Sequence, residues 1–97
     1  MNEKWPFDQP CNAATVTSEA VTKGKKPILL VSHSSEDHSW AFLTGEPFSM
    51  EDAQLVALKE IVELDPTLAA IADLPPGWSA KRQGVEYEWH RYEDPEV

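Results

Sequence analysis

The sequence predicts an α+β fold: an antiparallel sheet of four or five strands, with one amphipathic helix (about 49–64) and a short second helix (about 66–72) packed on one face. Three observations favour this fold class. The chain has 97 residues, the size of one domain, so residues 1–97 are expected to share a single core. Strand-like segments occupy both the first and the last parts of the chain. Helical periodicity is strongest between them.

The two ends of the chain are predicted to lie outside the sheet. Residues 1–11 contain Trp5, Phe7 and two prolines, so this N-terminal arm is expected to run extended and to place its aromatic rings against the domain. Residues 92–97 are expected to form a loose C-terminal tail, because chain ends are poorly ordered unless other elements hold them.

The first half of the chain is typical of three strands and one helical turn. Residues 12–17 are rich in β-branched side chains, which favours a strand, and Ser18 can cap a helical turn over residues 19–21. Residues 28–33 form an apolar run between a proline and a polar turn, which predicts a central strand. The aromatic segment 40–44 follows that turn, which predicts a hairpin.

The amphipathic helix is predicted from its first residue and from its periodicity. Ser49 is expected at the N-cap, with acids in the first turn, where they complement the positive end of the helix dipole. On a helical wheel Leu55, Leu58, Ile61, Val62 and Leu64 fall on one half, and Asp52, Lys59, Glu60 and Glu63 on the other. Pro66 ends this helix and suits the first turn of the second one.

The last two strands are predicted over residues 78–82 and 85–91, joined by a turn at Gln83 and Gly84. Strands, a helical pair and then strands again give the α+β assignment. The order of the strands within the sheet stays open.

Charge is distributed unevenly along the chain. Seventeen acids against eight bases give a formal net charge of −9, which opposes binding to nucleic acid or to anionic lipid. Residues 36–73 contain nine acids and one base, so most of the excess lies in this segment. These acids are predicted to form a surface that attracts a basic protein partner, although acids on a solvated face also serve solubility alone.

The residues predicted to bind that partner are acids of this segment together with two tryptophans as possible anchors. They are Glu36, Asp37, Trp40, Glu51, Asp52, Glu60, Glu63, Asp65 and Trp78. Tryptophan is enriched in binding hot spots, but a small domain also buries tryptophan in its core. The oligomeric state stays open.

The sequence indicates a cytoplasmic protein. Its longest apolar run, residues 28–31, is far shorter than a membrane-spanning helix, and its N-terminus has no pattern of a secretion signal. A single cysteine, Cys11, cannot form an internal disulfide, which is consistent with a reducing compartment.

No catalytic, cofactor or metal site is predicted. His33, Asp37 and His38 lie near several serines, but a catalytic triad is assembled from distant segments on rigid supports, and these residues share one polar turn. Cys11 and the three histidines lack the short spacings of zinc sites. The four glycines stand far apart, so no phosphate-binding loop is present.

Several motifs together resemble a family of small bacterial proteins of unknown function that is grouped with predicted immunity proteins of polymorphic toxin systems. The motifs are Trp5-Pro6-Phe7, the segment from Pro27 through Glu36-Asp37 to Trp40-Ala41-Phe42-Leu43, Leu64-Asp65-Pro66, and Asp73-Leu74-Pro75-Pro76-Gly77-Trp78-Ser79-Ala80. The resemblance covers most of residues 5–82. It implies a role in neutralising a bacterial toxin and carries over no catalytic residues.

The sequence therefore predicts a non-catalytic, acidic protein-binding domain, with an immunity protein as the specific form that the resemblance implies. Two alternatives stay open. One is a housekeeping or regulatory binding module unrelated to toxins. The other is a small hydrolase that uses His33 and His38.

Overall fold

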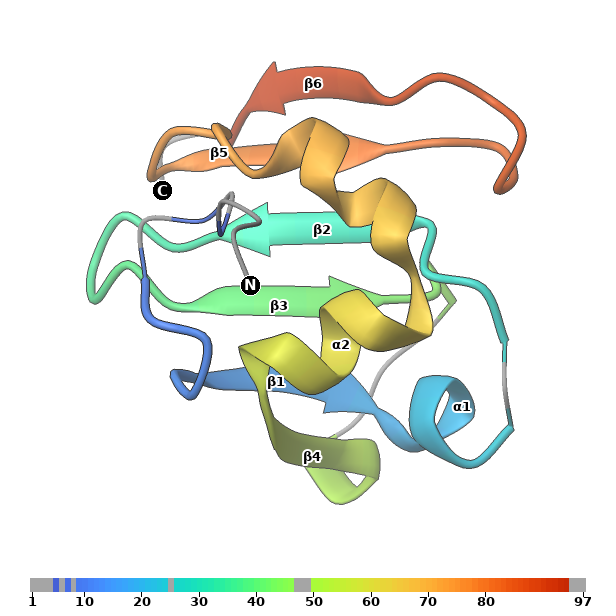
Figure 1. The fold of residues 1–97 in the computed structure, drawn as a ribbon. Helices are drawn as coiled ribbons and strands as arrows, with labels where there is room; N and C mark the ends of the chain where they lie inside the picture. The colour runs from blue at the N-terminus through green and yellow to red at the C-terminus, as the bar shows by residue number, and fades with distance from the viewer. Residues whose placement is uncertain (1–4, 6, 8, 25, 47–49, 95–97) are drawn as a thin grey trace.

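The computed structural model describes residues 5, 7, 9–24, 26–46 and 50–94. In chain order the elements are β1 (Ala14–Ser18), α1 (Glu19–Thr22), β2 (Leu30–His33), β3 (Trp40–Leu43), η1 (Met50–Asp52), β4 (Ala53–Ala57), α2 (Leu58–Leu64), η2 (Pro66–Ile71), β5 (Trp78–Lys81) and β6 (His90–Glu93). Figure 1 shows one sheet with α2 and η2 lying across one of its faces. The α+β class is thus confirmed.

The sheet differs from the predicted one in strand number and direction. Its six strands have the order β4-β1-β3-β2-β5-β6. Strands β1 and β3 are parallel, and every other neighbouring pair is antiparallel. The predicted β2–β3 hairpin is present, with Val31 opposite Phe42. Strand β3 is antiparallel to β2 within the hairpin and parallel to β1 on its other side, so the sheet is mixed.

The long helix predicted over residues 49–64 is wrong in its first half. Residues 50–52 form a 3-10 turn, residues 53–57 form the edge strand β4, and only Leu58–Leu64 is α-helical. The ladder between β4 and β1 satisfies backbone groups of this segment in place of a helix. Leu55, assigned to the core by the helical wheel, is 74% exposed. Ser49, the predicted N-cap, lies outside the described residues.

The second helix is present as the 3-10 helix η2. The predicted role of Pro66 at its start is confirmed, since Pro66 is its first residue. A carboxylate oxygen of Asp65 accepts a hydrogen bond from the backbone N–H of Thr67 at 3.0 Å, which caps the new helix.

The last strand pair is shifted from its predicted position. Strand β5 matches the expected segment, but β6 covers residues 90–93 in place of 85–91. The predicted tight turn is wrong, because residues 82–89 form a longer connection between the two strands. Within this connection the side chain of Arg82 is buried, and the ring of Trp89 lies against its guanidinium. The first two residues of the expected loose tail, Tyr92 and Glu93, pair with β5.

The core lies between the sheet and the layer of α2 and η2. Cross-strand neighbours share a face, so Phe42, Val31 and Ala80 point together toward the helices. These side chains are fully buried with Leu58 and Ile61 of α2. No helix within the described part of the chain has the length and apolar character needed to cross a bilayer.

The N-terminal arm contributes aromatic side chains to this core. Phe7 is buried, and its ring meets the ring of Trp40 edge to face with centroids 5.1 Å apart. The indole N–H of Trp5 donates to the backbone carbonyl of Gln9 at 2.6 Å. The described part of the arm is thus bound to the domain at the end of β3 where Trp40 lies.

Candidate functional site

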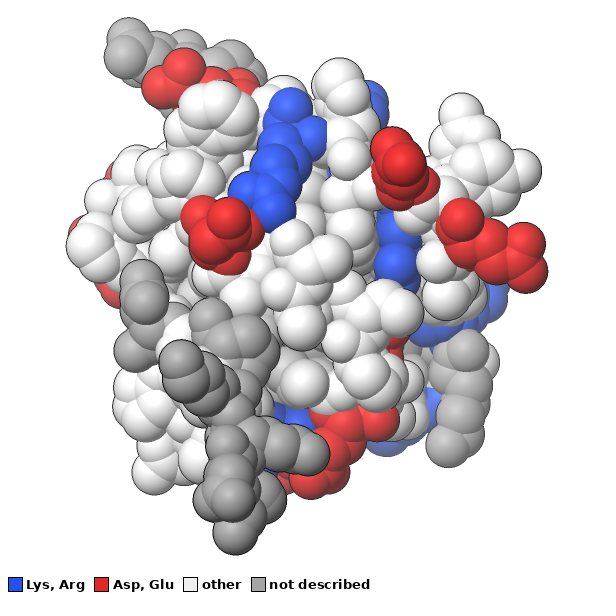
Figure 2. All heavy atoms as spheres, turned by 45° about the horizontal axis from the view of Figure 1, so that its top comes forward, with Lys and Arg blue, Asp and Glu red and all other residues white. Residues whose placement is uncertain are grey.

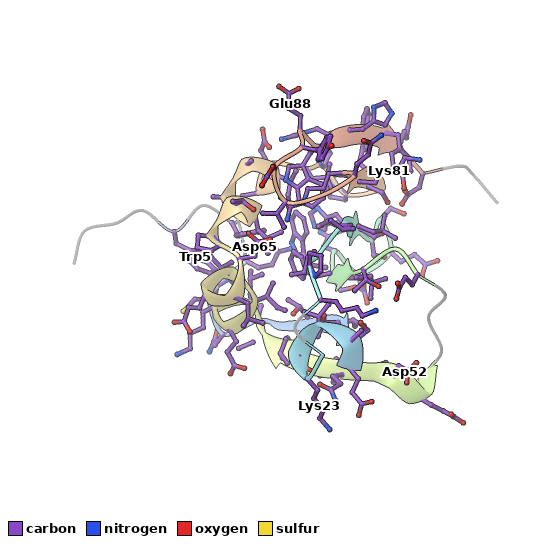
Figure 3. All side chains as sticks on the ribbon, turned by 90° about the vertical axis from the view of Figure 1, so that its right-hand side faces the viewer. Trp5, Lys23, Asp52, Asp65, Lys81 and Glu88 are labelled. Carbon is purple, nitrogen blue, oxygen red and sulfur yellow. The ribbon has the colours of Figure 1, made fainter. Side chains whose placement is uncertain are left out.

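The acidic residues predicted to bind a partner are distributed over several parts of the molecule. Glu36 and Asp37 lie in the turn before the first residue of β3, whereas Glu51 and Asp52 lie beside the last residues of β1 and β3. The two pairs therefore occupy opposite ends of the sheet. Figure 3 also places Asp52 and Asp65 on opposite sides of the molecule. The structure does not bring all of these carboxylates onto one surface.

The two tryptophans proposed as anchors face the core. Trp40 is 2% exposed, its ring stacks on the His33 ring with centroids 4.0 Å apart, and its indole N–H donates to Gln9 Oε1 at 2.8 Å. Trp78 is half-buried and lies opposite His33 in the sheet. The ring of Trp40 is therefore closed to a partner in this conformation.

Asp65 is engaged in an internal ion pair. Its carboxylate lies 2.6 Å from the guanidinium of Arg82, whose side chain is 1% exposed. Arg82 also donates to the carbonyl of Ile28 and to the hydroxyl of Thr67, and its guanidinium lies 4.2 Å from the centre of the Trp89 ring. The charge of Asp65 is thus balanced within the molecule, and the contact fixes η2 against β5.

Glu60 and Glu63 of α2 are the two predicted residues that the structure brings together at a surface hollow. They line a groove of about 420 Å³ between α1, β4 and α2. The other residues that line it are Thr22, Gln54, Val56, Ile61 and Leu64. The groove combines an apolar floor with two carboxylates, and none of its lining residues is basic.

This groove suits the side chain of a lysine or arginine. The aliphatic stem of such a side chain packs on apolar surface while its charged end reaches a carboxylate at the rim. The hydroxyl of Thr22 donates to the amide oxygen of Gln54 at 2.5 Å, which joins α1 to β4 across the groove. Its walls are therefore held by contacts within the described residues.

Sequence reasoning missed Thr22, Gln54 and Val56 as residues of the groove. The cause is the assignment of residues 53–57 to a helix, which separates them from α1. A signal was present, since these five residues carry no charge, and a charge-free stretch is atypical of a surface helix.

A larger hollow of about 590 Å³ lies beside the connection between β5 and β6. It is lined by Lys81, Arg82, Gln83, Tyr87, Glu88 and His90, so both signs of charge border it. Arg82 is already engaged by Asp65, and Lys81 lies 5.5 Å from the centre of the Tyr92 ring. Its basic groups therefore have partners within the molecule.

The two histidines considered for hydrolysis differ in environment. His33 is buried, and its Nδ1 lies 2.7 Å from the carbonyl oxygen of Leu74, which accepts a hydrogen bond from the ring. His38 is exposed and has a positive φ of 62°. The ring centroids are 6.1 Å apart. The contact with Leu74 gives His33 a structural role between β2 and the segment after η2.

The serines and the acid of the same turn shape its backbone. The hydroxyl of Ser34 accepts from the N–H of Glu36, and Asp37 Oδ1 accepts from the N–H of Ser39. Hydrogen bonds from the side chain and backbone of Ser39 lower the pKa of Asp37 below its usual range. The polar residues of this turn thus act on the turn itself.

Metal-binding side chains are dispersed in the described part of the chain. No three His, Cys, Asp or Glu residues within it are grouped so that they could hold an ion. Cys11 is a free, exposed thiol.

The chain matches no protein-family model, no curated protein and no solved structure. The resemblance to the family grouped with immunity proteins therefore stays a prediction. Of the predicted site residues, Glu60 and Glu63 are the pair that shares a hollow with apolar side chains.

Proposed function

We propose that this chain is a non-catalytic protein-binding domain that captures a basic protein partner at the groove between β4 and α2. One observation carries the proposal: Glu60 and Glu63 border an apolar hollow that no basic residue lines. An exposed carboxylate pair attracts a cationic partner over a Debye length of about 8 Å at physiological salt, and the apolar floor adds contact area once the partner is bound.

The net charge of −9 supports the same choice of partner. It repels nucleic acid and anionic membranes and accelerates encounter with a basic protein. A toxin domain that itself binds nucleic acid is a basic protein of this kind. An immunity protein is therefore the specific form of the proposal, supported by the resemblance of residues 5–82. A resident cytoplasmic partner is the alternative form.

Charge reversal at the groove tests the proposal. The variant Glu60→Lys with Glu63→Lys is expected to lose capture of the partner by at least about tenfold, because repulsion replaces attraction at the contact. The matched control is Glu86→Lys with Glu88→Lys, which makes the same change of charge at two exposed residues between β5 and β6. The control is expected to retain capture, because it changes the net charge by the same amount and leaves the carboxylates of the groove in place.

The measurement is quantitative capture from a lysate of the native host by the three immobilised proteins, repeated at rising salt. A basic protein held by the wild type and the control, but not by the groove variant, supports the proposal. Equal capture by all three proteins contradicts it. A captured toxin domain favours the immunity form, and a resident protein favours the housekeeping form.

A further inference from the structure

The two edges of the sheet differ in how their backbone groups are used. Strand β4 forms the lower edge in Figure 1, and β6 forms the upper edge. In an antiparallel pair, alternate residues direct both the N–H and the C=O toward the neighbouring strand, and the residues between them direct both groups away. The N–H of Leu58 donates to the carbonyl of Ala13 at 2.8 Å, which fixes this alternation along β4.

The alternation leaves the backbone of Leu55 directed outward. Gln54 and Val56 bond to β1, so the N–H and C=O of Leu55 point away from the sheet. No described strand lies beyond β4. The side chain of Leu55 is also the most exposed of the large apolar side chains in the described residues, at 74%.

The edge at β6 is protected in a way that β4 is not. The N–H of Asp94 donates to the carbonyl of Gly77 at 2.8 Å, so Arg91 and Glu93 are the residues whose backbone groups point outward there. Both carry charge, which disfavours pairing with another strand. Strand β4 contains no charged residue, proline or glycine, so none of its own side chains protects this edge in the way that Arg91 and Glu93 protect β6.

We propose that the partner binds by strand addition: an extended segment of the partner pairs with β4 and becomes a seventh strand of the sheet. This inference rests on the proposed function and specifies how the basic partner is held. Pairing with a free edge supplies backbone hydrogen bonds, and the flanking pockets select the side chains.

The register of the added strand defines its sequence. Residues opposite each other in a sheet share a face, so the partner residue opposite Leu55 lies with Leu55 on the face turned away from α2. The partner residues directly before and after that residue lie on the opposite face, together with Gln54 and Val56. This face borders the groove that Glu60 and Glu63 line. An apolar residue flanked by lysine or arginine on both sides therefore fits this edge.

Charge favours such a partner over a second copy of this chain. Two copies paired through β4 would bring two proteins of net charge −9 together, with Glu60 and Glu63 of each copy near the same edge. A strand with lysines on one face neutralises these carboxylates.

The test uses a synthetic nine-residue peptide of alternating lysine and valine, blocked at both ends, and measures its binding by calorimetry. Two further peptides carry N-methyl groups, either on every valine amide or on every lysine amide. When the peptide pairs antiparallel to β4 with valine opposite Leu55, the valine amides face β4 and the lysine amides face solvent. Methylation of the valine amides is expected to weaken binding by at least about tenfold, because each blocked amide removes a backbone hydrogen bond. Methylation of the lysine amides is expected to leave binding within about twofold.

Variants of the protein separate the backbone of Leu55 from its side chain. Leu55→Pro removes the outward N–H, which no bond within the sheet uses, so the fold is expected to survive with an unchanged near-ultraviolet circular dichroism spectrum. It is expected to weaken peptide binding more than Leu55→Ala, which keeps the N–H and removes most of the side chain.

The outcomes distinguish this inference from the proposed function. Equal binding of both methylated peptides overturns strand addition, and the groove stands if charge reversal at Glu60 and Glu63 still weakens binding. No peptide binding up to about 1 mM also overturns strand addition, while capture of a basic partner that depends on the groove would keep the proposed function. A dimer of the free protein that Leu55→Pro dissolves would assign the edge to a second copy and overturn the inference.

Discussion

The two edges of this sheet differ in how readily they can pair with a further strand: charged residues protect β6, and β4 has no such residues. At β6 the residues whose backbone groups face outward are Arg91 and Glu93, and at β4 they are Ala53, Leu55 and Ala57, none of which is charged. Figure 2, which turns the upper side of the molecule toward the viewer, shows basic and acidic side chains next to one another there. An unpaired edge strand invites pairing with another strand, so the difference indicates which edge is available to a partner.

The closed edge is anchored by an ion pair. Arg91 donates to the carbonyl of Ala70 in η2 and to the carboxylate of Asp73 just after η2, each at 2.7 Å. These two bonds join β6 to the helical layer. The hydrogen bond from Arg91 lowers the pKa of Asp73. The hydroxyl of Ser79 donates to Asp94 at 2.6 Å beyond the end of β6. Contacts of this kind hold β6 in place.

The largest loss of stability is expected from replacing Arg82, the buried side chain that anchors the β6 side of the sheet. Replacing Arg82 by alanine removes the guanidinium that donates to Asp65 Oδ2 and to the carbonyl of Ile28. Breaking a buried ion pair by removing one partner costs about 3–5 kcal/mol of unfolding free energy. Urea unfolding of the variant measures this loss. Leu55→Ala on the β4 side is the comparison, with an expected change within about 0.5 kcal/mol because its side chain is exposed. Equal losses in the two variants would contradict the difference in anchoring.

A smaller effect is expected from opening the protected edge. Replacing both Arg91 and Glu93 by valine removes the charges from the outward-facing residues of β6 and is expected to lower stability by about 1 kcal/mol or less, since the ion pair of Arg91 is partly exposed. The variant is expected to bind a second molecule of the lysine–valine peptide, measured as a change in stoichiometry from one to two.

The control keeps the charge at both residues, as Arg91→Lys with Glu93→Asp. It is expected to bind one peptide, as the wild type does. If the valine variant also binds a single peptide, charge is not what closes the β6 edge.

Local patterns in the sequence predict the centre of the sheet correctly. Residues 28–33 and 40–44 each contain an apolar strand with a polar turn between them, and both observed strands of the hairpin lie within these segments. Both strands are central, and every second side chain of each is buried on the face toward the helices: Val31, His33, Trp40 and Phe42. The proline at residue 66 likewise marks a real boundary between two helices.

The edges could not be predicted because tertiary pairing decides them. Residues 53–57 pair with residues 14–18, and nothing in the local sequence states that β1 offers them a ladder. The apolar spacing of Leu55, Leu58 and Ile61 also fits a helix, so residues 53–57 were predicted as part of the helix although they form a strand. The groove depends on this strand, and therefore Glu60 and Glu63 were predicted as site residues without the residues that form its floor.

Hydrogen exchange at the backbone amide of Leu55, measured by NMR with and without the lysine–valine peptide, shows whether β4 is an open edge that accepts a strand. In the free protein the amides of Leu55 and Arg91 are both expected to exchange fast, because each points away from the sheet, while those of Gln54 and Tyr92 are protected by their neighbouring strands. The peptide is expected to protect Leu55 and to leave Arg91 unchanged. A Leu55 amide that is slow in the free protein, or that stays fast when the peptide is bound, would contradict strand addition at β4.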